Sequence, residues 1–244
     1  MRALSASELL ETWDQGCGQS PTRQALTLLH AACRETALEQ LAQLSIGQRD
    51  AMLLELRELT FGPLLTSLAS CPGCGERLEL EPLTSDLNAT AVPAPSGDLS
   101  LVLDRHEIRF RLPTSLDLLA ISEEPESDSA RASLLARCIY TARFDGCEVE
   151  PRSLPPTVVE AIGARMAEAD PQADCRLELK CPACHNQWQS QFDIVSFFWA
   201  EINAWAARIL NEVHTLASAY GWSEADILKM SVRRRRSYLN LVSA

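Results

Sequence analysis

Two short stretches decide how this chain folds: CPGCGERLELE at residues 71–81 and CRLELKCPAC at residues 175–184. Each combines a CPxC motif, in which two residues separate two cysteines, with a run that alternates charged residues and leucines. Such alternation is typical of a half-buried β-strand, and a tight CPxC turn lets both sulfur atoms face one ion. The sequence therefore predicts two cysteine knuckles that each border a strand.

Together the knuckles offer four thiolates, from Cys71, Cys74, Cys181 and Cys184. Four thiolates form a closed tetrahedral ligand set for Zn²⁺, so we predict one structural zinc ion per chain, in a zinc ribbon with a long insertion between its halves. A zinc ion with four protein ligands has no open coordination position. The predicted site therefore stabilises the fold and does not catalyse a reaction.

Other interpretations of the knuckles stay open. CPACH at residues 181–185 matches the CxxCH pattern of covalent haem attachment, and CPxC is also a redox dithiol pattern. Haem attachment usually requires export, and the amino terminus shows no signal peptide. A redox dithiol is expected between a strand and a helix, whereas both neighbours here resemble strands. A motif that no longer holds zinc, or one that forms a site between chains, is a further alternative.

Helical patterns dominate the rest of the chain. Residues 1–70 contain three or four short helices that begin at capping residues such as Ser5 and Ser45. Between Asp193 and Gly221, apolar residues recur every three or four positions, which indicates one long helix, and a restart helix follows. The sequence predicts a mainly helical α+β fold with a small antiparallel zinc-ribbon β layer and a long C-terminal helix.

The middle of the chain is predicted to add to this β layer and to insert helices into it. Alternating runs at 99–103 and 107–112 predict a hairpin, and a helical face continues through residues 134–142. Segments 91–98 and 123–129 are interpreted as an exposed loop and an acidic linker. We expect one integrated domain with an N-terminal helical region (1–70), a zinc-ribbon layer (71–193) with a helical insertion (about 115–169), and C-terminal helices (194–244).

Composition limits the classes of function. Lys plus Arg number 22 and Asp plus Glu number 33, which gives a net charge of −11 and disfavours general binding to polyanions. Nine cysteines in 244 residues argue against a secreted disulfide scaffold and for a reducing, cytoplasmic location. No apolar run is long enough to cross a bilayer. Because the motifs G-x-S-x-G, GxxxxGK[ST], GxGxxG and HExxH do not occur either, we expect a protein that is not an enzyme.

One cationic cluster lies near the C-terminus. It is a solvated helix face, a docking patch for an acidic partner or a nucleic-acid contact. The net charge of the chain favours an acidic protein partner over a nucleic acid. The candidate partner-binding residues are Trp222, Arg233, Arg234, Arg235, Arg236 and Tyr238.

Five segments carry a family resemblance: SELLETWDQGCGQSP (7–21), LSIGQRDAMLLELRELTFG (44–62), FRLPTSLDLLAI (110–121), FDIVSFFWAEINAW (192–205) and LASAYGWSEADILKMSVRRRRSYLNLV (216–242). With these segments, the chain resembles the T-even phage-type baseplate hub assembly chaperones, which are encoded among the tail genes of contractile phages and phage-tail-like contractile injection systems.

The resemblance implies a small factor that assists tail assembly in the bacterial cytoplasm, or a permanent component of the baseplate. Its partners are then hub or spike proteins, with no small-molecule substrate and no membrane span. The metal ligands are predicted from the cysteine spacing and not from the resemblance. A zinc-ribbon nucleic-acid-binding adaptor is the alternative function, and a thiol oxidoreductase is a third.

Overall fold

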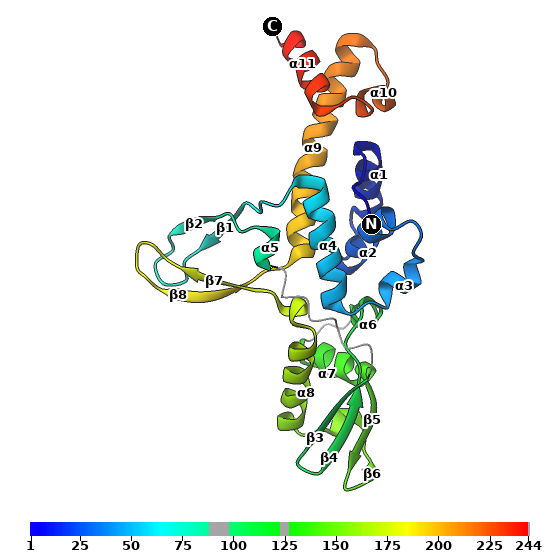
Figure 1. Cartoon of the computed structure of the whole chain (residues 1–244), viewed down its shortest axis with the longest axis vertical. Helices are drawn as coiled ribbons and strands as arrows, with labels where there is room; N and C mark the ends of the chain where they lie inside the picture. The colour runs from blue at the N-terminus through cyan, green and yellow to red at the C-terminus, as the bar shows by residue number, and fades with distance from the viewer. Residues whose placement is uncertain (88–97, 123–126, 244) are drawn as a thin grey trace.

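A single long helix, α9 (Ile194–Tyr220), forms the spine of the upper part of the molecule in Figure 1. The carboxylate of Asp193 caps its first turn by accepting hydrogen bonds from the backbone N–H groups of Val195 and Ser196. Gly221 ends it in a left-handed conformation, with φ 68°. The computed structural model describes residues 1–87, 98–122 and 127–243. Within them, no helix is long and apolar enough to cross a membrane.

Of the four helices in the N-terminal region, α1, α2 and α4 pack against α9, and α3 packs against α2. Ser5 and Ser45 each form a capping box, as the sequence predicts. The main apolar cluster buries Leu28, Leu53 and Phe198 completely and joins these helices to α9. The four helices are α1 (Ala6–Gly16), α2 (Pro21–Ala32), α3 (Leu38–Ala42) and α4 (Ile46–Phe61).

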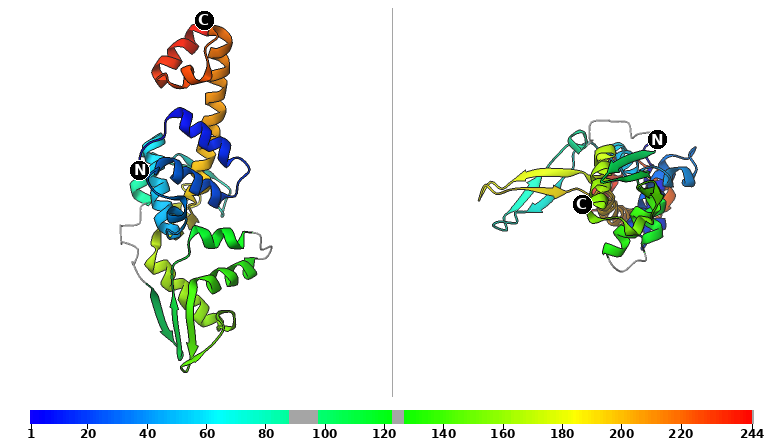
Figure 2. Two further views of the ribbon diagram at one scale, coloured as in Figure 1. Left: turned by 90° about the vertical axis from the view of Figure 1, so that its right-hand side faces the viewer. Right: turned by 90° about the horizontal axis from the view of Figure 1, so that it is seen from below.

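A four-stranded antiparallel sheet forms the lower part of the molecule (Figure 1), with strand order β3-β4-β5-β6. Its buried face packs against α8 through a second apolar cluster that includes Ile108, Phe110 and Ile162. Helices α6 and α7 lie between this sheet and the upper helices (Figure 2). The elements are β3 (Leu99–Leu103), β4 (His106–Phe110), α6 (Ser115–Ile121), α7 (Ser127–Cys138), β5 (Ile139–Phe144), β6 (Cys147–Glu148), η1 (Pro151–Ser153) and α8 (Pro156–Ala169).

The structure corrects the helix predicted through residues 134–142. Helix α7 ends at Cys138, and the chain continues as β5, which pairs with β4. The run Ile139, Tyr140 and Thr141 consists of β-branched and aromatic residues that favour a strand. Segment 91–98 lies almost entirely outside the described residues, as does the first part of segment 123–129, whose last residues belong to α7.

Two separate hairpins project sideways from the helical body (Figures 1 and 2). Each is a two-stranded antiparallel sheet, and among the described residues its strands pair neither with the other hairpin nor with the four-stranded sheet. The prediction of one β layer is therefore wrong, because the strands at 99–103 and 106–110 pair in a sheet with a core of its own. The hairpins are β1 (Ser67–Ser70) with β2 (Arg77–Leu80), and β7 (Arg176–Lys180) with β8 (Gln187–Gln191); α5 (Thr84–Leu87) and η2 (Pro171–Asp174) flank them.

The C-terminal segment folds back against the far end of α9. The predicted restart helix consists of two helices, α10 (Glu224–Leu228) and α11 (Val232–Val242). Ser223 caps α10 and Ser231 caps α11, each with a side-chain hydroxyl that accepts a backbone hydrogen bond. A third apolar cluster around Val213, Leu216 and Ile227 holds this end together.

Candidate metal centre

The two knuckles have the same backbone design. In each, six residues (71–76 and 181–186) connect paired strands, and the first cysteine is hydrogen-bonded to the last loop residue. The N–H of Cys71 donates to the carbonyl of Glu76 at 2.8 Å, and the N–H of Cys181 donates to the carbonyl of Asn186 at 2.9 Å. The fifth residue of each loop is left-handed: Gly75 with φ 77° and His185 with φ 60°.

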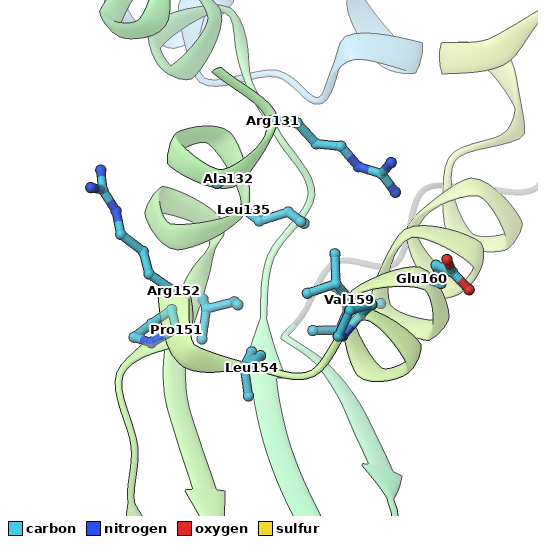
Figure 3. Close-up of a pocket in the computed structure, with 11 residues that line it drawn as sticks. Arg131, Ala132, Leu135, Pro151, Arg152, Leu154, Val159 and Glu160 are labelled. Atoms are coloured by element: carbon cyan, nitrogen blue, oxygen red, sulfur yellow. The ribbon is translucent and has the colours of Figure 1, made fainter. Parts of the chain in front are cut away.

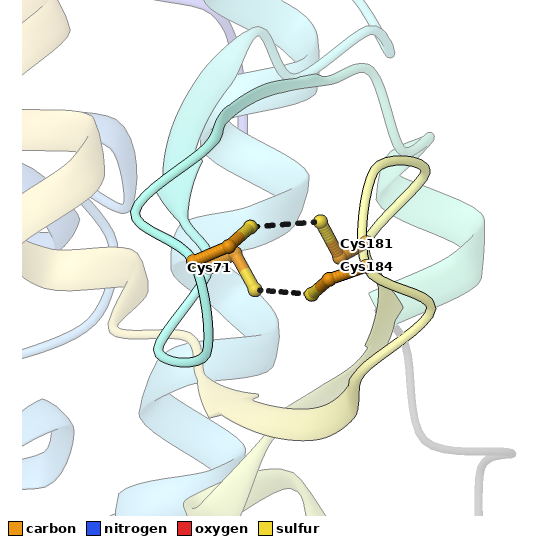
Figure 4. A group of neighbouring side chains, drawn as sticks. Cys71, Cys181 and Cys184 are labelled. Carbon is orange, nitrogen blue, oxygen red and sulfur yellow. Dashed lines mark hydrogen bonds between the residues drawn. The ribbon is translucent and has the colours of Figure 1, made fainter.

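These turns bring the four predicted ligands together at the tips of the hairpins (Figure 4). The Sγ atoms of Cys71 and Cys184 are 3.6 Å apart, as are those of Cys74 and Cys181. All four sulfur atoms lie within 4.8 Å of one another. A disulfide needs about 2.05 Å, whereas a tetrahedral ion with Zn–S bonds of about 2.3 Å sets its sulfur atoms about 3.8 Å apart. The arrangement is thus compatible with metal binding.

The electrostatics of the cluster favour a first thiolate at Cys71. Burial opposes its ionisation, but hydrogen bonds from the backbone N–H groups of Gly73 and Cys74, and from the thiols of Cys184 and Cys181, lower the pKa of Cys71 to about 6. The Gly73 N–H lies 3.4 Å from the Cys71 Sγ. This donor was not predicted from the sequence, although the glycine inside the CPGC motif was a signal for it.

The thiol of Cys74 is held neutral by its neighbours. A backbone hydrogen bond from Glu76 favours the Cys74 thiolate, but contacts with the thiols of Cys184 and Cys181 outweigh it and raise the pKa of Cys74 to about 12. Four thiolates this close repel one another unless a cation neutralises them. The donor set therefore suits a divalent cation better than a metal-free cluster.

The burial pattern shows what the cluster does for the fold. Within both hairpins, spanning residues 67–80 and 176–191, the only buried residues are Cys71 and Cys181. Strand residues that face inward, such as Leu78 and Leu179, are only half-buried. Two-stranded hairpins are marginally stable on their own. The cysteine cluster thus takes the place of a hydrophobic core.

The predicted arginine cluster lies on α11, which packs against the C-terminal end of α9. Its members differ in how far they are exposed to solvent. Arg233, Arg234 and Arg236 are exposed. Arg235 is only 4% exposed, and its guanidinium donates to the Glu212 carboxylate at 3.0 Å and to the Met230 carbonyl at 2.9 Å. Arg235 therefore anchors α11 to α9 and leaves three arginines facing solvent.

The predicted aromatic residues pack against each other beside these arginines. Trp222 stacks on Tyr220, with ring centroids 4.4 Å apart, and meets Tyr238 edge-on at 4.8 Å. The guanidinium of Arg234 lies 5.7 Å from the Tyr238 ring centroid. Tyr220 was not among the predicted partner-binding residues, and the left-handed turn at Gly221 brings it against Trp222.

A comparison with protein-family models matches residues 18–199 to the family described as T4 bacteriophage base plate protein. This chain belongs to that family. The match spans all four cysteines and ends within α9, so the arginine cluster lies outside it. The predicted resemblance to T-even-type phage baseplate proteins is thereby confirmed. Comparisons of this base plate family member with curated proteins and with solved structures gave no significant match.

Proposed function

We propose that this base plate family member is a non-enzymatic assembly factor or structural component of the baseplate hub in a contractile phage tail or phage-tail-like injection system. The family match over residues 18–199 supports the baseplate role. The second part of the proposal is one structural Zn²⁺ per chain. It is supported by the four-cysteine cluster, in which all sulfur atoms lie within 4.8 Å of one another.

A zinc ion at this site would hold two distant parts of the chain together. The first hairpin follows α4, and the second precedes α9. The metal would therefore close the long segment between residues 81 and 175, which contains the four-stranded sheet, at the side of the helical body. Closing such a segment lowers the conformational entropy of the unfolded chain. The metal would act alongside direct contacts between these parts, such as the hydrogen bond that the Gly47 N–H donates to the Asp170 carboxylate at 2.9 Å.

The compartment of assembly is part of the same proposal. Thiolates that bind zinc must stay reduced, and a reducing cytoplasm maintains them. We propose that the protein acts in the bacterial cytoplasm during tail assembly, where its partners are hub or spike proteins. The exposed arginines of α11, together with Trp222 and Tyr238, are the proposed contact for an acidic surface on such a partner.

Two measurements test these points. Metal analysis of the protein purified from bacteria should find one zinc per chain, reduced in Cys181→Ser and unchanged in Cys147→Ser, which alters an exposed cysteine outside the cluster. A metal-free and equally stable protein would refute the zinc site.

For the partner surface, hub and spike proteins expressed with this protein should co-purify less when Arg233, Arg234 and Arg236 become Glu. Arg208→Glu on the exposed surface of α9 is the matched control. Unchanged co-purification of the triple variant would reject the α11 contact.

A further inference from the structure

The four-stranded sheet has one covered face and one open face. Its inner face packs against α8, and Figure 3 shows Leu135, Leu154 and Val159 pointing into the space between α7 and α8 on that side, where a cavity of about 260 Å³ remains. The outer face carries alternate side chains of β3, β4 and β5, which are all exposed: Ser100, Val102, Glu107, Arg109, Thr141 and Arg143. A strand added at the edge of the sheet therefore leaves its core undisturbed.

Strand β3 forms one edge of this sheet, because the strand order is β3-β4-β5-β6. Edge strands of soluble proteins are usually protected from further pairing by charged residues, proline, bulges or shortness. The other edge, β6, is two residues long. In contrast, β3 has five residues, Leu-Ser-Leu-Val-Leu, without a charge or a proline, and it pairs with β4 in a regular register. Its Val102 side chain is 74% exposed, so β3 is an unprotected edge.

The backbone of β3 offers hydrogen bonds to the open side. The two-residue turn at 104–105 is left-handed at both positions, with φ 47° and 64°, and it joins the opposed residues Leu103 and His106. Such a turn closes on a hydrogen-bonded pair, so every second residue of β3, counted back from Leu103, exchanges hydrogen bonds with β4. The N–H and C=O groups of Ser100 and Val102 then point away from β4. Among the residues that the structure describes, no backbone group pairs with them.

We propose that β3 pairs antiparallel with β3 of a second copy of this chain, about a two-fold axis at Leu101. Ser100 of each copy then lies opposite Val102 of the other, and each of these two pairs exchanges both backbone hydrogen bonds. On the inner side, the half-buried Leu101 side chains of the two copies meet at the axis. The contact is independent of the cysteine cluster and of the arginines on α11, so it goes beyond the proposed function.

Charge favours a second copy as the occupant of this edge. On β4, Arg109 lies opposite Ser100, and Glu107 lies opposite Val102. In the proposed pairing, Arg109 of each copy shares a row across the outer face with Glu107 of the other, and only the small side chains of Ser100 and Val102 lie between them. Although Arg143 lies opposite Glu107 on β5, no ion pair in the described part of the chain involves Glu107 or Arg109. Both charges are thus available for the second copy.

The same two charges select the register. An axis at Ser100 would align Arg109 of both copies in one row, and an axis at Val102 would align Glu107 of both copies. Like charges that face each other across strands are destabilising. Of these three registers, the one with its axis at Leu101 brings opposite charges together.

The size of the contact indicates a weak dimer. Each copy contributes one strand of five residues, which is much less than a standard protein interface. At both ends of the pairing, Asp98 lies opposite the turn residue Asp104 of the other copy, and this contact between like charges opposes association. We expect a dissociation constant on the order of 100 μM.

Sedimentation equilibrium of the zinc-loaded full-length protein tests the association. We expect monomers at about 5 μM and about half of the chains in dimers at about 100 μM. Val102→Lys places a charge on the edge and should abolish the dimer over this range, without unfolding a protein in which this side chain is exposed. Val232→Lys, at a valine that is 55% exposed on α11, is the matched control and should leave association unchanged.

Charge reversals test the register. Arg109→Glu sets like charges against Glu107 of the other copy, and Glu107→Arg does the same against Arg109. Each variant alone should therefore associate about fivefold more weakly than the parent protein. A mixture of the two variants restores opposite charges in both rows, so mixed dimers should form as strongly as the parent dimer. Damage to the fold would not be repaired by mixing.

Hydrogen exchange locates the paired strand. The backbone amides of Ser100 and Val102 should exchange about twofold more slowly at about 200 μM than at about 5 μM protein. The amide of Leu101, which is already bonded to β4, should exchange at the same rate at both concentrations.

Four results would overturn the proposal. A protein that stays monomeric at all these concentrations would leave the edge to a strand of a different protein. Association of Val102→Lys as strong as that of the parent would place the contact elsewhere on the surface. Failure of the mixed charge-reversal variants to recover, or unchanged exchange at Ser100 and Val102, would reject the register.

Discussion

The four-stranded sheet buries one face beneath α8, where Ile108, Phe110 and Ile162 are almost inaccessible to solvent. The two cysteine hairpins have no such face, since their only buried residues are Cys71 and Cys181. Of their leucines, only Leu177 packs, partly buried, against the main apolar cluster. Both regions are antiparallel and consist of short strands. Strand pairing is similar in both regions. They differ in what holds the strands in place, which is apolar burial in the sheet and a cluster of thiols in the hairpins.

The largest expected effect comes from breaking the thiol cluster. Cys181→Ser should release the metal and open both hairpins, because structural zinc contributes on the order of 10 kcal/mol in comparable small sites and no apolar core replaces it. Limited proteolysis followed by mass spectrometry should find new cleavage within residues 67–80 and 176–191. Cys147→Ser, an exposed cysteine in β6, is the control. Equal protease resistance in both variants would contradict this account of the hairpins.

The complementary change breaks the core of the sheet. Phe110→Ala removes a fully buried ring and should cost about 3–5 kcal/mol of unfolding free energy, measured by urea denaturation. Zinc content should stay at one per chain, because the hairpins do not share this core. Val102→Ala, at a side chain that is 74% exposed on β3, should change stability by less than about 0.5 kcal/mol. Loss of zinc in Phe110→Ala would show that the two regions depend on each other.

A smaller effect on stability is expected at Asp50 on α4. Helix α4 contacts η2, where the chain passes from α8 toward the second hairpin. Burial raises the pKa of Asp50 to about 6, against the opposing effect of Arg49, and the carboxylates of Asp193 and Asp170 raise it further. A carboxyl group whose pKa is higher in the folded state stabilises the fold fully below its unfolded pKa, near 3.8, and loses that contribution as the pH rises through about 6.

Relative to the parent protein, Asp50→Asn should therefore gain stability between pH 3.5 and pH 8, by at most about 3 kcal/mol. This gain adds to a pH-independent loss, because Arg49, whose guanidinium lies 2.7 Å from the Asp50 carboxylate, loses its partner. Urea denaturation at several pH values measures the difference. Asp14→Asn, at an exposed position on α1, controls for the loss of a surface charge. A constant difference across this pH range would argue that Asp50 does not titrate as described.

The smallest effect is expected on the outer face of a hairpin. Leu68 is 60% exposed on β1, so Leu68→Ser should change the unfolding free energy by less than about 0.5 kcal/mol and leave zinc content unchanged. The contrast with Cys181→Ser within the same pair of hairpins isolates the contribution of the thiols. A large destabilisation by Leu68→Ser would indicate apolar packing that the burial pattern does not show.

Much of the candidate site could be predicted from the sequence because its signals are local. The CPxC spacing positions two sulfur atoms on one turn, so Cys71 and Cys74 are neighbours whatever the rest of the chain does. The alternating leucines beside each motif identify the strands. The uninterrupted periodicity from Asp193 to Gly221 predicts α9 almost to the residue. Each of these patterns is complete within about 30 residues.

What could not be predicted depends on contacts between distant residues. Within the part of the chain that the structure describes, the strands divide into three sheets according to which of them share a core. The alternation of polar and apolar residues is the same in β2 and β4, so it does not predict this division. The stretch 134–142 shows helical periodicity that continues past the end of α7. The pairing of β5 with β4 is what turns its second half into a strand. Among four consecutive arginines, nothing local marks Arg235 as the one that meets Glu212, 23 residues earlier.

Hydrogen exchange of the native protein, with and without removal of the metal by a chelator, tests the central claim most directly. We predict that chelation abolishes the protection of backbone amides in β1, β2, β7 and β8, while protection in β3, β4 and β5 is retained. Unchanged protection of the two hairpins in the metal-free protein would contradict the claim that a metal held by Cys71, Cys74, Cys181 and Cys184 takes the place of their core.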